Sequence, residues 1–229
     1  MTGLICMQGG SEFTPACRPM DEAWLARVER RAICIAPLAC AAGAEYRTAA
    51  DNGARYLHDL GVDDVSMAPE PDVSLDGAVR AIVDAQVVFI PGGSPTRARQ
   101  RIVGTAIAGA LRAHIAAGGT VIGASAGAMV LADHMVLPGR TMQVRSGLGL
   151  VPDVLVLPHY GESRGLVLDE VIAQVSGIAT ILGLPSCGGV LYETGDEGAA
   201  PVALGTRTSW RITAGSDPAP ITAASAAQR

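Results

Sequence analysis

Short, nearly continuous apolar runs alternate with stretches of helical spacing, and this rhythm constrains the fold more than any other feature of the chain. The runs are residues 4–7 (LICM), 32–39 (AICIAPLA), 86–90 (QVVFI), 120–124 (TVIGA) and 154–157 (VLVL). Strands that are apolar on both faces are typical of a parallel sheet, because each parallel connection returns through a helix that covers the sheet. The pattern therefore predicts a three-layer α/β/α fold with a mostly parallel sheet.

Composition and helix signals agree with this prediction. Hydrophobic residues make up 49% of the chain and aromatic residues only 3%, so aliphatic side chains must build the core. One helix is expected at 74–85, with Ser74 as its N-cap, and another from Ser94 to Gly118. A further helix is expected at about 163–176.

The pattern becomes β-rich after about residue 182, with segments such as 189–193 (GVLYE) and 209–212 (SWRI). We expect these segments to form a β-rich C-terminal extension, antiparallel to the rest of the same sheet. The last residues carry Pro, Ser and Ala without periodicity. Residues 1–213 are therefore expected to form a single α/β domain, and 214–229 a disordered tail.

Charge and hydropathy exclude several classes of protein. The net charge is −5 and no segment concentrates Lys or Arg, so nucleic acid is not an expected partner. The apolar runs are too short to cross a bilayer and the N-terminus lacks a basic region, so we expect a cytoplasmic protein with no membrane partner.

The cysteines are odd in number and form no C-x-x-C pair, which argues against a disulfide framework and a zinc knuckle. We expect all of them to be reduced and mostly buried. They are Cys6, Cys17, Cys34, Cys40 and Cys187. Because the histidines and cysteines lack the spacing of metal ligands, the sequence implies no metal and no organic cofactor.

Three unusual stretches follow apolar runs, where an open α/β sheet binds its ligands: 91–94 (PGGS), 125–127 (SAG) and 158–163 (PHYGES). Ser125 is flanked by small residues in Gly123–Gly127 (GASAG), a pattern typical of a nucleophile elbow. Such a turn exposes the serine oxygen and leaves the amide of Ala126 free for an oxyanion. The alternative is an ordinary strand-to-helix turn rich in small residues.

His159 is the one histidine of four that follows an apolar run, and histidine is the usual general base for a serine. We expect His58 and His114 to lie on helices, and His134 to end a short helix, so the ordinary structural interpretation suits these three. Gly92 and Gly93 offer a second oxyanion amide or a plain helix-entry turn.

Four motifs in order resemble the aspartyl dipeptidase and cyanophycinase family of serine peptidases: GLICMQGGSEF, VVFIPGGSPTRARQRI, VIGASAGAMV and SGLGLVPDVLVLPHYGESRG. The resemblance covers residues 3–195 and implies a class I glutamine amidotransferase-like, flavodoxin-like fold. It also implies that Ser125 is the nucleophile, that His159 is the base, and that the amides of Gly93 and Ala126 form the oxyanion hole. A glutaminase of that fold would have a cysteine nucleophile at the elbow, so Ser125 argues against a glutaminase.

One position departs from the family pattern. Members commonly carry a glutamate that orients the histidine, in a segment like GIDE, whereas residues 183–189 read GLPSCGG and Ser186 stands at the glutamate's position. Glu193 is a tentative third catalytic residue, and Glu162 and Asp153 are other substitutes that no spacing argument separates.

We therefore expect a serine hydrolase, a peptidase or amidase that acts on a small peptide-like substrate through an acyl-enzyme. Gly92, Glu12 and Arg164 are candidate substrate-binding residues, although a surface role suits Glu12 equally well. The alternative is a catalytically weak or inactive relative that binds a peptide or metabolite in the same crevice. The oligomeric state stays open, with a homodimer as one option.

Overall fold

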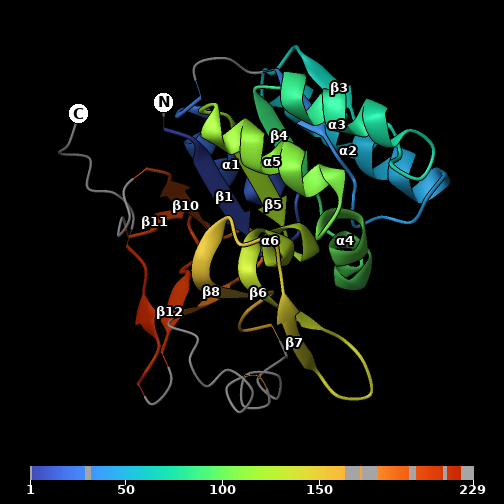
Figure 1. Ribbon diagram of the computed structural model, residues 1–229. Coiled ribbons are helices and arrows are strands. Elements are labelled where there is room, and N and C mark those ends of the chain that lie inside the picture. The colour runs from blue at the N-terminus through green and yellow to red at the C-terminus, as the bar shows by residue number, and fades with distance from the viewer. Residues whose placement is uncertain are drawn as a thin grey trace.

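The computed structural model describes residues 2–28, 32–162, 171, 180–195, 200–213 and 216–222. In this part of the chain the strands form two sheets, with α6 (Ala126–Leu131) packed between them (Figure 1). The first sheet has the order β11-β10-β1-β5-β4-β2-β3 and the second has the order β13-β12-β9-β8-β6-β7.

The centre of the first sheet is the parallel array that the apolar runs predict. Its parallel strands are β1 (Leu4–Gln8), β5 (Thr120–Ala124), β4 (Val87–Ile90), β2 (Ile33–Ile35) and β3 (Val65–Met67). At one edge β10 (Gly189–Glu193) pairs antiparallel with β1, and β11 (Val202–Leu204) pairs antiparallel with β10.

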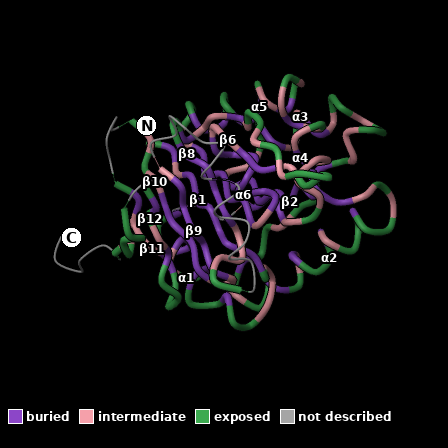
Figure 2. The backbone as a smooth tube through the Cα atoms, turned by 90° about the horizontal axis from the view of Figure 1, so that it is seen from below, coloured by how far each residue is buried: buried purple, intermediate pink, exposed green. Residues whose placement is uncertain are grey.

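Helices cover both faces of this sheet, which confirms the mixed α/β fold. On β4, Val88 and Ile90 face the apolar cluster that contains α3 (Leu75–Asp84) and α5 (Ala106–Ala116). Val87 and Phe89 face the other cluster, which contains α1 (Arg18–Leu25) and α2 (Ala44–Asp59). Figure 2 shows the buried strands at the centre and the exposed outer side of α2 at the periphery.

The second sheet corrects the expectation of one continuous sheet. It contains β6 (Ala132–Leu137), β7 (Gln143–Ser146), β8 (Val151–Pro158), β9 (Thr180–Leu184), β12 (Trp210–Ile212) and β13 (Ala219–Pro220). A parallel crossover needs a dozen residues or more, whereas α6 has six and β6 begins directly after it. The chain therefore starts a new sheet, and the C-terminal strands divide between the two sheets.

Two further local expectations are wrong. The helix expected from Ser94 to Gly118 is two helices, α4 (Pro95–Ile102) and α5, because Gly104 adopts a φ of 79° and Thr105 caps the second helix by accepting from the amide of Ile107. His134 lies on β6 rather than at a helix end. The helix expected at 163–176 falls almost wholly outside the described residues.

Residues 216–222 lie within the segment expected to be disordered, and the structure shows backbone pairing there. Within 216–222 the short strand β13 pairs with β12, and the amide of Ile221 donates to the carbonyl of Ser209 at 2.8 Å. These backbone bonds leave no trace in sequence periodicity, since β13 spans two residues. No helix in the described ranges has the length and apolar character needed to cross a membrane.

Candidate active site

Ser125 stands on a sharp turn between β5 and α6. Its backbone has φ 49° and ψ −111°, a conformation that is costly for a residue with a side chain. The turn is held from both sides, because the amide of Ser125 donates to the carbonyl of Gln8 at 2.9 Å and its carbonyl accepts from the amide of Met129 at 3.0 Å. This geometry is the nucleophile elbow that the small residues predicted.

The glycines around Ser125 leave no room for side chains. A Cβ on Gly123 would lie 2.5 Å from the carbonyl oxygen of Gly127, and a Cβ on Gly127 would lie 2.1 Å from that of Ile90. The first contact is between the two arms of the turn and the second is with the neighbouring strand β4. The pattern G-A-S-A-G is therefore the steric condition for bending the chain so sharply.

His159 is positioned by the end of β1. It follows β8 with a φ of 53°, and its amide donates to the carbonyl of Gly9 at 3.0 Å. The imidazole packs on Gly10, where a Cβ would lie only 2.2 Å from its Cε1 atom. In this position Nε2 of His159 is 3.1 Å from Oγ of Ser125, a hydrogen-bond distance.

The other ring nitrogen of His159 faces Ser186 and Glu162. Nδ1 lies 3.0 Å from Oγ of Ser186, and that hydroxyl donates to Oε2 of Glu162 at 2.9 Å. The amide of Ser186 donates to Oε1 of the same carboxylate at 3.1 Å. Oε2 of Glu162 is itself 3.7 Å from Nδ1, so a negative charge stands beside the imidazole although no carboxylate occupies position 186.

These bonds select one tautomer of His159. A serine hydroxyl carries one proton, and that of Ser186 is given to Glu162, so Ser186 can only accept from Nδ1–H. Nε2 is then left without a proton and can accept from the hydroxyl of Ser125. The arrangement holds His159 in the form that a general base requires.

Glu162 is ionised in this arrangement. Desolvation is the largest single influence and would raise its pKa, but the two hydrogen bonds from Ser186 and the positive charges of His159 and Arg207 together outweigh it, so the net pKa is lowered. The Glu162 side chain keeps 40% of its exposure and that of His159 keeps 29%, so water screens the pair in part.

Gly92 and Gly93 lie beside the elbow. A Cβ on Gly92 would lie 3.1 Å from Cβ of Ser125, and the amide of Gly92 donates to Oε1 of Glu12 at 2.6 Å. Gly93 has a φ of 145°, which favours glycine. Ala126 is the first residue of α6, so its N–H has no acceptor within the helix. The structure thus brings Gly92 and Glu12 close to Ser125, and Gly93 and Ala126 are the residues that follow Gly92 and Ser125 in the chain.

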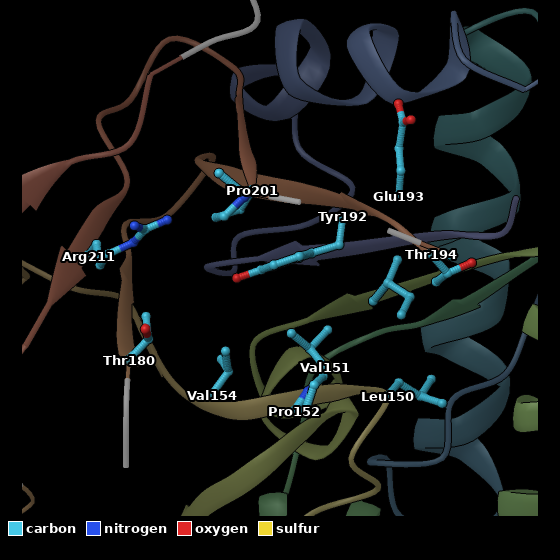
Figure 3. A pocket seen from close by; sticks show the side chains of 13 residues that line it. Leu150, Val151, Pro152, Val154, Thr180, Tyr192, Glu193, Thr194, Pro201 and Arg211 are labelled. Atoms are coloured by element: carbon cyan, nitrogen blue, oxygen red, sulfur yellow. The ribbon is translucent and has the colours of Figure 1, made fainter. Parts of the chain in front are cut away.

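Glu193 does not belong to this site. It pairs with Leu4 at the opposite end of β1 and forms an ion pair with Arg27 at 2.9 Å. Figure 3 shows it among the residues that line a cavity of about 450 Å³ at that end of the sheet. Asp153 is likewise remote, near the start of β8, and Arg164 lies outside the described residues.

The remaining histidines have structural surroundings. A ring nitrogen of His114 lies 3.1 Å from the carbonyl of Thr120, and one of His58 lies 2.7 Å from that of Val62. Sequence reasoning did not single out Gly9 and Gly10, which seat His159. Their signal is a pair of adjacent glycines directly after the first apolar run.

Comparisons with known proteins identify the family and the fold of the chain. The family model described as Peptidase family S51 matches residues 5–196. A peptidase from an acI-B1 Actinobacterium has a similar structure, with a TM-score of 0.78, 20% identity and coverage of 98% of this chain and 96% of that one. A putative peptidase E protein from Listeria monocytogenes EGD-e has a TM-score of 0.63 and 16% identity, with coverage of 90% of this chain and 100% of that one.

No curated protein matches the chain in sequence. The two solved structures show a shared fold, and the family model spans most of the chain, including three of the motifs on which the resemblance was based and all but the first two residues of the other. The chain therefore belongs to peptidase family S51, a family of serine peptidases.

Proposed function

We propose that this peptidase cleaves a small peptide-like substrate through an acyl-enzyme, with Ser125 as the nucleophile and His159 as the general base. The observation that supports this assignment best is the 3.1 Å contact between Oγ of Ser125 and Nε2 of His159, formed at a strained elbow. A strained backbone costs free energy, and such strain is found mainly at functional sites. Strain that presents a serine to a histidine therefore supports a catalytic role.

Catalysis would begin when Nε2 of His159 takes the proton from Ser125 as its Oγ attacks the substrate carbonyl. The amides of Ala126 and Gly93 would donate to the oxyanion that forms, while the amide of Gly92 is already bound to Glu12. His159 then returns the proton to the leaving amine. Water, deprotonated by the same nitrogen, hydrolyses the acyl-enzyme and frees Ser125.

Ser186 and Glu162 would act as positioning residues rather than as groups that touch the substrate. Ser186 fixes the tautomer of His159, and the Glu162 carboxylate, 3.7 Å from Nδ1, stabilises the imidazolium that forms during attack. Serine at position 186 was the feature that favoured an inactive binding protein. Because Glu162 supplies the missing charge, the geometry favours the enzyme over that alternative.

A fluorophosphonate probe tests the assignment, since it reacts with serines that a neighbouring base has activated. Mass spectrometry should find the adduct on Ser125, and Ser125→Ala should abolish it. His159→Ala should slow labelling by orders of magnitude, whereas the matched variant His134→Ala should label normally because His134 lies on β6 and pairs with Asp133. Folded wild-type protein that takes up no probe would contradict the proposal.

A further inference from the structure

Two thiols from distant parts of the chain lie side by side, and one of them belongs to the residue that follows Ser186. The Sγ atoms of Cys17 and Cys187 are 2.7 Å apart, although the residues are separated by 170 positions. Cys17 ends the 3-10 helix η1 (Pro15–Cys17), and Cys187 directly follows Ser186 in the turn between β9 and β10. Both cysteines are free thiols in the structure.

Backbone hydrogen bonds hold the segments that carry both thiols. The amide of Cys187 donates to the carbonyl of Gly10 at 3.0 Å, and that of Gly9 donates to the carbonyl of Gly188 at 2.8 Å. The amide of Cys17 donates to the carbonyl of Thr14, also at 3.0 Å. A disulfide has an S–S length of about 2.05 Å, so the two sulfur atoms need to approach by only about 0.7 Å.

We propose that Cys17 and Cys187 are a modification site: oxidised glutathione, or another small-molecule disulfide, converts them to a disulfide that fastens the turn carrying Ser186 to the N-terminal segment. Gly9 and Gly10 belong to that segment and also seat His159. The crosslink would therefore join the parts of the chain that hold the two ring nitrogens of His159 in position.

Cys187 is the thiol that meets the oxidant, because it is partly exposed whereas Cys17 is buried. Burial, and next the hydrogen bond to Cys187, raise the pKa of Cys17 well above its usual value, so few Cys17 thiolates are available to start the reaction. The Cys187 thiolate attacks glutathione disulfide and releases one glutathione. Cys17 then loses its proton, attacks Sγ of Cys187 and releases the second glutathione, so that one disulfide is consumed for each disulfide formed.

The test equilibrates the folded full-length protein with oxidised glutathione, alkylates the remaining thiols after unfolding, and identifies the peptides by mass spectrometry. We expect one crosslinked pair, Cys17 with Cys187, and alkylated Cys6, Cys34 and Cys40. A crosslink across such a long loop should raise the melting midpoint by roughly 5 °C or more. Cys187→Ser should lose both effects, and the matched variant Cys34→Ser should keep both, because Cys34 is buried on β2.

The crosslink does not depend on the proposed function, so Ser125→Ala should form the same disulfide. Its benefit to the site does rest on the proposed function, and the oxidised protein should label at Ser125 at least as fast as the reduced one. The proposal is overturned if both thiols stay free, if the reaction stops at glutathione bound to Cys187, or if the disulfide lowers the melting midpoint. Slower labelling after oxidation would overturn the role in holding the turn of Ser186.

Discussion

The imidazole of His159 and the carboxylate of Glu162 are linked in two ways. Nδ1 lies 3.7 Å from Oε2, and the hydroxyl of Ser186 bridges the two groups. The Ser186 hydroxyl donates a hydrogen bond to the carboxylate, so its oxygen accepts one from Nδ1–H of the imidazole. The carboxylate thereby orients His159 through Ser186. Glu162 follows His159 by three residues, and its amide donates to the carbonyl of His159 at 3.1 Å. A serine and a nearby glutamate together occupy the place of a single orienting glutamate.

Replacing Glu162 by glutamine should lower the rate of fluorophosphonate labelling by roughly tenfold to a hundredfold, about 1.4 to 2.7 kcal/mol of barrier. The loss should fall short of that in a triad with a buried carboxylate, because Glu162 is partly exposed and bonds the histidine through Ser186. Glu193→Gln is the control, since Glu193 pairs with Arg27 at the far end of β1, and its labelling should be unchanged. Equal effects of the two variants would show that Glu162 has no special role.

Glutamate at position 186 should help only when Glu162 is neutral. In the single variant Ser186→Glu two carboxylates would crowd one site, and their repulsion should prevent a gain in labelling rate. In the double variant Ser186→Glu with Glu162→Gln one carboxylate faces Nδ1 directly, so labelling should be faster than in Glu162→Gln alone. Thermal melts must show that both variants fold. A double variant that labels more slowly than Glu162→Gln would mean that the side chain at position 186 does not interact with His159.

The charge of Glu162 should not change with pH across the neutral range. Its pKa is lowered from the usual value, so the folded carboxylate stays charged wherever a free glutamate is charged. The carbon NMR shift of the Glu162 carboxyl group should therefore titrate only below the usual glutamate pKa of about 4.3, as the carboxylate takes up a proton. A titration midpoint of that carbon between pH 5 and 8 would contradict the charge assigned to Glu162.

A methyl group at Gly10 should damage the site more than the fold. In Gly10→Ala the new Cβ would lie 2.2 Å from Cε1 of His159 and push the imidazole away from Ser125. Gly61→Ala is the matched control, because Gly61 also has a positive φ, 82° against 125°, but has nothing within 4 Å of its Cβ position. Both variants should lose about 1 kcal/mol or more of stability through backbone strain. Only Gly10→Ala should lose labelling. Equal labelling of the two variants would contradict the claim that Gly10 positions the imidazole of His159.

The sequence predicts Ser125 and His159 because each follows an apolar run, and strand ends are where such folds place reactive groups. It does not select Glu162, since the contact depends on Ser186 arriving from the end of β9, which pairs with β8 in the second sheet. Periodicity also does not reveal that second sheet, because its start depends on α6 being too short for a crossover. Local patterns thus predict the nucleophile and the base, whereas the group that orients the base depends on pairing between distant strands.

The formation of an acyl-enzyme on Ser125 can be measured directly with an activated ester such as a p-nitrophenyl ester of a short peptide. Because the ester releases its phenol on acylation, rapid mixing should show a burst of one phenol per active chain, followed by slower turnover as water frees Ser125. Intact mass spectrometry during the burst should find the acyl group, and digestion should place it on Ser125. Steady release that Ser125→Ala leaves unchanged, with no acyl group on the folded chain, would contradict the mechanism.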